Sequence, residues 1–115
     1  MRVVPKPEAQ SPAGWLAPSL SVTVLAIRWT PSVGAQYLLW SEKQKSVALF
    51  PTTDFAIADN HISPLWIVKS DLRGNLEFAP AQWLVNGFWE DYYESGSAAV
   101  RVFEDVLKQL ECRCE

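Results

Sequence analysis

The sequence predicts an α+β fold in which an antiparallel sheet precedes a helical C-terminal third. Short apolar runs separated by turn residues extend from Leu20 to Phe78, which is typical of strands joined by tight connections. Helical features begin only at Pro80, and strands do not alternate with helices, which argues against a parallel sheet. We expect five or six short strands, compatible with a meander or a small SH3-like barrel, then short helical turns and one C-terminal amphipathic helix.

The composition is that of one globular domain. Hydrophobic residues make up 49% and charged residues 20% of 115 residues, enough apolar surface for a single core. The chain is tryptophan-rich, and most of its six Trp must pack because exposed indoles are a solubility liability. We divide the chain into an N-terminal arm, residues 1–19, and a single α+β domain, residues 20–115. Four prolines in the arm fix φ and remove backbone donors, so little regular structure is expected there.

The first strand is expected to run from Leu20 to Trp29. Leu20, Val22 and Val24 alternate with Ser21 and Thr23, which is the period of two that a strand with one buried face requires. The pattern then becomes continuously apolar over residues 25–27, so this strand is expected to enter the interior. The turn residues of segment 30–34 end it.

Two hairpins and one further strand follow. Residues 37–40 and 47–50 flank a polar loop, and residues 65–68 and 76–78 flank a turn that contains Gly74, which can adopt a positive φ. Residues 55–58 form a short strand between the hairpins.

The C-terminal third is expected to be helical. Pro80 suits a first helical position, residues 81–85 and 88–93 suit short turns, and Ser97 is a candidate N-cap for a helix from Ala98 to about Glu111. The apolar residues of this last helix recur at helical spacing and form a core-facing stripe: Ala99, Val102, Phe103, Val106, Leu107 and Leu110.

The net charge of −3 is concentrated at the C-terminal end. Residues 1–89 hold seven basic and six acidic side chains, whereas residues 90–115 hold three basic and seven acidic ones. A polyanion would be repelled there, so we expect no nucleic-acid partner; a basic protein partner is compatible with this charge. Solvated helix surface is the simpler interpretation of the same acids.

We expect the protein to be cytoplasmic and not to contact a membrane, because its sequence contains neither the apolar core of a signal peptide nor an apolar run long enough to span a bilayer. Cys112 and Cys114 agree with this compartment, since they lie too close in sequence to form an easy disulfide. With the single His61 they cannot complete a four-ligand zinc site within one monomer without carboxylates, and nothing in the sequence supports a metal shared across a dimer. We therefore expect no metal and no cofactor.

No sequence motif marks a catalytic site. Asp59 and His61 could pair as a base and its carboxylate, but the surrounding residues suggest a surface turn and no nucleophile is marked. Glycine-rich phosphate loops, HExxH, nucleophile elbows and CxxC pairs do not occur. We expect no catalytic residue and consider an enzyme improbable.

The most informative segment is Phe88-Trp89-Glu90-Asp91-Tyr92-Tyr93-Glu94, in which four aromatic rings are interleaved with three carboxylates. Such rings can belong to the core, to a contact surface or to both. Glu90, Asp91 and Glu94 could also act as paired acids or bind a cation, although helix-surface acids explain them more simply. We assign partner binding to the six residues of this segment that follow its first ring: Trp89, Glu90, Asp91, Tyr92, Tyr93 and Glu94.

The favoured hypothesis is a small non-enzymatic interaction module that binds another protein through this acidic and aromatic surface, as a neutralising inhibitor, immunity protein or antitoxin would. The alternative is a small-molecule binding domain or minor enzyme whose Trp-lined pocket has Tyr37, Trp40 or Trp66 on its wall. A homodimer that uses the same rings is a third hypothesis.

Overall fold

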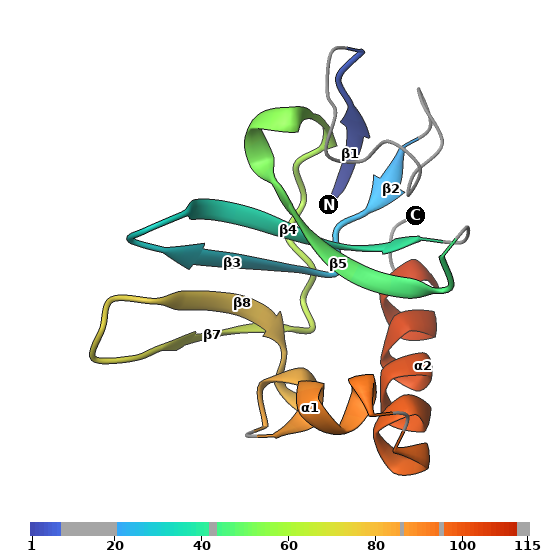
Figure 1. Cartoon of the computed structure of the whole chain (residues 1–115). Helices are drawn as coiled ribbons and strands as arrows, with labels where there is room; N and C mark the ends of the chain where they lie inside the picture. The colour runs from blue at the N-terminus through green and yellow to red at the C-terminus, as the bar shows by residue number, and fades with distance from the viewer. Residues whose placement is uncertain (8–20, 42–43, 86, 95, 113–115) are drawn as a thin grey trace.

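The computed structural model, which describes residues 1–7, 21–41, 44–85, 87–94 and 96–112, has two antiparallel sheets and a C-terminal helix (Figure 1). This confirms the expected α+β class. The smaller sheet has the order β2-β1-β6 and the larger one the order β5-β4-β3-β8-β7. The strands are β1 (Arg2–Pro5), β2 (Val22–Thr23), β3 (Ala26–Thr30), β4 (Gly34–Ser41), β5 (Ser46–Pro51), β6 (Phe55–Asp59), β7 (Trp66–Ser70) and β8 (Leu76–Pro80). The helical elements are η1 (Thr52–Asp54), η2 (Ala81–Leu84), α1 (Phe88–Tyr93) and α2 (Ser97–Cys112).

The first expected strand is two strands in different sheets, which corrects the sequence prediction. Val24 and Leu25 are adjacent and each is only 1% exposed, so their side chains must enter two different cores. The chain therefore leaves the smaller sheet after β2 and enters the larger one at β3. Local alternation could not reveal this crossing, because each half by itself has a pattern compatible with one strand.

The arm contains a strand, which corrects the expectation of little regular structure over its first residues. β1 pairs with β2 and β6, and Val3 is fully buried between the two sheets. The Arg2 guanidinium adds side-chain bonds to Ser21 and Thr23 beyond the ladder. The remainder of the arm from residue 8, together with Leu20, lies outside the described residues.

The two predicted hairpins are confirmed. Leu38 faces Leu49 in the β4–β5 pair, and Val68 faces Phe78 in the β7–β8 pair. Gly74 has a φ of 86° in the second turn, as its position requires. Among the described strands no pairing joins β5 to β7, so the five-stranded sheet is open rather than closed into a barrel.

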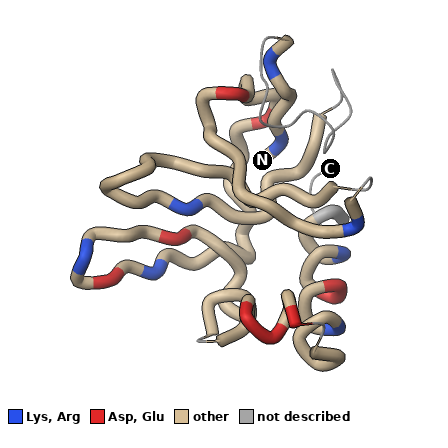
Figure 2. Tube along the Cα trace, viewed as in Figure 1, with Lys and Arg blue, Asp and Glu red and all other residues tan. Residues whose placement is uncertain are grey.

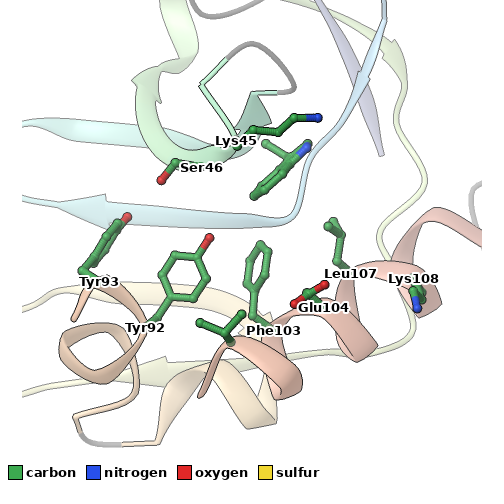
Figure 3. Close-up of a pocket in the computed structure, with 10 residues that line it drawn as sticks. Lys45, Ser46, Tyr92, Tyr93, Phe103, Glu104, Leu107 and Lys108 are labelled. Carbon is green, nitrogen blue, oxygen red and sulfur yellow. The ribbon is translucent and has the colours of Figure 1, made fainter. Parts of the chain in front are cut away.

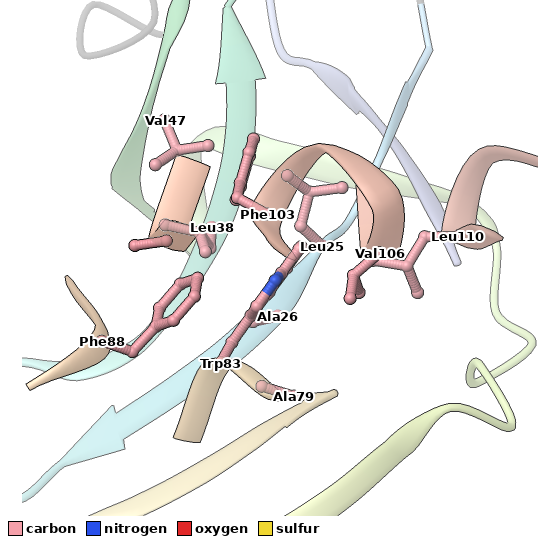
Figure 4. Packing of buried hydrophobic residues seen from close by; sticks show 11 residues of the cluster. Leu25, Ala26, Leu38, Val47, Ala79, Trp83, Phe88, Phe103, Val106 and Leu110 are labelled. Carbon is pink, nitrogen blue, oxygen red and sulfur yellow. The ribbon is translucent and has the colours of Figure 1, made fainter. Parts of the chain in front are cut away.

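Two hydrophobic cores occupy the two faces of the larger sheet. The first lies between this sheet and the helical elements, and Figure 4 shows Trp83 of η2 beside Phe103 of α2 at its centre. The second lies between the two sheets and contains Val3, Tyr37 and Phe55. The face of α2 that enters the first core has the predicted spacing, with Ala99, Phe103, Val106 and Leu110 all buried.

The helix boundaries differ from the prediction by about one residue. The Val100 amide bonds to the Gly96 carbonyl, so Ser97 is already helical and Gly96 takes the N-cap position expected for Ser97. Pro80 ends β8 and precedes η2, so it is not the first helical residue. Its extended ψ of 140° suits a residue that closes a strand immediately before a helical turn.

Candidate functional site

The Phe88–Glu94 segment exposes its acids and places three of its four rings in or against the first core. Helix α1 starts at Phe88 because Gly87 has a φ of 83°, which favours glycine and turns the chain sharply. Glu90, Asp91 and Glu94 are exposed, and Figure 2 places the acidic residues of α1 at the end of the molecule away from the smaller sheet. The sequence prediction treated these six residues as one surface. In the structure the three acids and Tyr93 are exposed, whereas Trp89 and Tyr92 are half-buried.

Trp89 and Tyr92 attach α1 to the first core. The Trp89 ring lies 5.8 Å from Trp83 and 6.1 Å from Phe103, measured between centroids. The Tyr92 ring lies 4.7 Å from Phe103. Both side chains are half-buried, so they contribute to stability as well as to any contact surface.

Tyr93 is different, because 58% of its surface is exposed. Its hydroxyl donates a hydrogen bond of 3.3 Å to the Val47 carbonyl oxygen on β5, which holds the ring against the sheet. Burial of part of the side chain raises the pKa of Tyr93 above its ordinary value of 10.0. The hydroxyl is neutral at physiological pH and can donate this bond. An exposed aromatic ring held in one orientation is a favourable contact group, since binding costs it little conformational entropy.

A groove of about 540 Å³ lies between the β4–β5 hairpin and the two α-helices (Figure 3). We call it the aromatic groove, because four rings line it: Trp40, Tyr92, Tyr93 and Phe103. The other lining residues are Lys45, Ser46, Val100, Glu104, Leu107 and Lys108, so charges of both signs surround an apolar floor.

Burial is the main cause that raises the pKa of Tyr92. The neighbouring Tyr93 and the Glu104 carboxylate act in the same direction, while a side-chain hydrogen bond with Ser46 opposes them. Tyr92 is therefore a neutral hydroxyl on the wall of the aromatic groove. It can donate a hydrogen bond to a bound group or accept one from it.

A second, smaller hollow of about 180 Å³ lies on the other side of Tyr93. Its walls include Trp89 and Tyr93 of α1, and Arg28 and Glu77 lie at facing positions on β3 and β8. Since Tyr93 lines the aromatic groove as well as this hollow, its ring stands between two recesses. An exposed ring with a recess on each side is a suitable anchor residue, because it can insert between side chains of a partner protein.

The structure places the three residues expected on the wall of a Trp-lined pocket in different surroundings. Tyr37 is buried in the second core, and the Trp66 indole donates a 3.0 Å hydrogen bond to the Leu25 carbonyl oxygen. Trp40 lies on the opposite face of the sheet and lines the aromatic groove. Sequence reasoning missed the contribution of α2 to this groove, although Glu104 and Lys108 flank the predicted apolar stripe at helical spacing.

The Asp59 and His61 pair forms a surface turn. The Asp59 carboxylate accepts hydrogen bonds from the His61 backbone amide at 3.0 Å and its ring at 2.7 Å, and the ring is 90% exposed. The backbone bond, followed by the ring bond, lowers the pKa of Asp59. The shallow recess here is lined only by residues 57–61, so no nucleophilic side chain faces His61 in it.

Within the described ranges, no group of three His, Cys, Asp or Glu side chains is arranged to hold a metal ion. Cys114 lies beyond the last described residue. Among the described residues, no helix is long and apolar enough to cross a membrane. Comparison with protein-family models, with curated proteins and with solved structures found no match to this chain.

Proposed function

We propose that this chain is a non-enzymatic module that binds another protein through Tyr93, the aromatic groove and the acidic face of α1. The observation that carries the proposal is the half-exposed Tyr93 ring, held by its bond to Val47 between two recesses. Protein interfaces typically have an aromatic centre and a polar rim, and the exposed Lys45, Glu104 and Lys108 form such a rim.

The charge around this surface favours a basic partner. Among the side chains that the structure describes, the two helices and Glu94 at the end of α1 present five exposed carboxylates against two exposed cations, Arg101 and Lys108. Such an excess accelerates the encounter with a basic protein and discourages acidic ones. The carboxylates are Glu90, Asp91, Glu94, Glu104 and Asp105.

The test compares affinity capture from the source cells by the wild type and by Tyr93→Ala. Tyr93 is preferable to Trp89 or Tyr92, because truncating those rings would also damage the core. We expect a specific partner whose affinity falls about thirtyfold or more in Tyr93→Ala, the loss of about 2 kcal/mol that defines an interface hot spot. Leu72→Ala, at a fully exposed apolar site on the β7–β8 turn, is the matched control and should leave binding unchanged.

A second variant tests the charge. Replacing Glu90, Asp91 and Glu94 by Gln, Asn and Gln should slow association and reduce its salt dependence, with a smaller effect on dissociation. Partner binding that is the same for the wild type, Tyr93→Ala and the neutralised variant would refute this surface as the contact site.

A small organic anion is the second candidate ligand. The volume of the aromatic groove lies within the range typical of small-molecule sites, and Lys45 and Lys108 are cations at its rim. Binding should quench Trp40 fluorescence, and Trp40→Phe should remove this signal. Trp66→Phe should not, because Trp66 does not line the groove. A signal that survives in Trp40→Phe would place the ligand elsewhere.

A further inference from the structure

Strand β7 is an open edge of the larger sheet. It is the outer strand of a hairpin that projects from the body of the molecule (Figure 1). All its residues after Trp66 are exposed, including Ile67 at 50% and Val68 at 59%. An edge strand offers unpaired backbone donors and acceptors, and exposed apolar side chains add surface that another strand can cover.

The register shows which backbone groups point outward. The Asp71 amide bonds to the Asn75 carbonyl, so this pair is a hydrogen-bonded one. Hydrogen-bonded pairs alternate along an antiparallel ladder, so Val68–Phe78 and Ser70–Leu76 are not bonded pairs. The amides and carbonyls of Val68 and Ser70 therefore face away from β8, towards the open edge.

The pairing of Trp66 agrees with this alternation. Its partner Pro80 has no amide hydrogen, as a non-bonded pair allows. The Trp66 amide also points outward, where it bonds to the Ser63 carbonyl at 3.2 Å, and this leaves the Trp66 carbonyl available at the edge.

The other edges carry features that hinder pairing, and β7 has fewer of them. β2 is two residues long, and β6 has a register irregularity at Ile57–Asp59. On β5, Tyr93 already occupies the Val47 carbonyl. β7 has no proline and no irregularity, and the ammonium of its one charged residue, Lys69, bonds to the Leu84 carbonyl at 3.0 Å.

We propose that β7 pairs with β7 of a second copy of this chain, antiparallel about a two-fold axis at Val68. The two Val68 residues exchange amide–carbonyl bonds across the axis, and each Ser70 amide donates to the Trp66 carbonyl of the second copy. The two five-stranded sheets then form one continuous sheet across the axis.

The strand sequence favours a second copy over a foreign strand because it is complementary to itself about Val68. Lys69 faces Ile67 of the second copy and Ser70 faces Trp66, so no like charges are opposed. Ile27, Phe78 and Val68 form one apolar row across three strands, and the two-fold axis joins this row to its copy. This inference does not depend on the proposed function, because the aromatic groove is formed by α1, α2 and the β4–β5 hairpin.

The test is sedimentation equilibrium of the purified chain up to about 1 mM, a range that detects even weak association. Val68→Pro removes an outward amide and leaves the β8 ladder intact, and Val68→Lys places two cations at the axis. Either change should weaken dimerisation about thirtyfold or more, since each acts twice. Ile57→Lys, at an equally exposed site on β6, is the matched control and should not alter it.

A cysteine crosslink tests the geometry without relying on those variants. Val68→Cys, in a chain with Cys112 and Cys114 replaced by Ser, should be joined efficiently by a short bismaleimide, whereas Ile57→Cys should not. A chain that stays monomeric throughout the concentration range overturns the proposal. A dimer that persists in both Val68→Pro and Val68→Lys also overturns the proposal. Loss of that dimer in Tyr93→Ala, which removes an exposed ring, would then locate it at α1.

Discussion

Removal of the Phe103 ring should destabilise the protein more than any single change on its surface. Phe103 is 1% exposed and contacts rings from three other elements: Trp40 on β4, Trp83 on η2, and Trp89 and Tyr92 on α1. The Trp83 ring stacks on it at 5.1 Å with an interplanar angle of 20°. Phe103→Ala should therefore cost about 3–5 kcal/mol, the range for truncating a buried aromatic side chain.

That cost is large against the total stability of a small domain, about 5–15 kcal/mol. Urea unfolding followed by tryptophan fluorescence and by far-ultraviolet circular dichroism measures it, with an unchanged m-value showing that stability alone has changed. Phe103→Leu should cost less because it leaves a smaller cavity. Gln109→Ala, on the exposed face of the same helix, should stay within about 0.5 kcal/mol of the wild type.

A loss of less than about 1 kcal/mol in Phe103→Ala would contradict the packing described for the first core. It would mean that α1 and η2 do not depend on α2 for their position. The aromatic groove, whose walls come from these elements, would then not be a stable feature.

Two further predictions concern the start of α1 and the three tyrosines. Gly87→Ala should destabilise the protein by about 1 kcal/mol, because a side chain is strained at a φ of 83°, and Gly87→Asn should cost less. Equal stability of Gly87→Ala and the wild type in thermal unfolding would refute this. Burial raises the pKa of all three tyrosines above 10.0, so the phenolate absorbance of the native protein should appear at higher pH than that of the unfolded protein. Because the unfolded state loses these protons first, the free energy of unfolding should fall as the pH rises above 10.0, and coincident titrations of the two states would contradict the burial.

The candidate site was predictable only in part. The Phe88–Glu94 segment stands out in the sequence because it combines rings with charge, and in the structure its Tyr93 lines both recesses. The direction of each side chain was not predictable, because the orientation of a helix of only six residues depends on how it packs against the rest of the molecule. Tyr37 and Trp40 lie three positions apart on β4 and therefore on opposite faces of the sheet, which the period of two predicts. Only the tertiary structure shows which core covers each face.

The sequence by itself determined the α+β class, the two hairpins and helix α2, because each depends on local periodicity and on turn residues close together in the chain. Only the tertiary structure decided what depends on distant partners. β1 became a strand because β2 and β6 lie beside it, with Val3 facing Val22 on one side and Ile57 on the other. Distant partners likewise decide that the adjacent residues Val24 and Leu25 lie in different cores, so that the chain passes from one sheet to the other between them. Local pattern specifies which residues can be buried, but the packing of remote segments specifies where each one is buried.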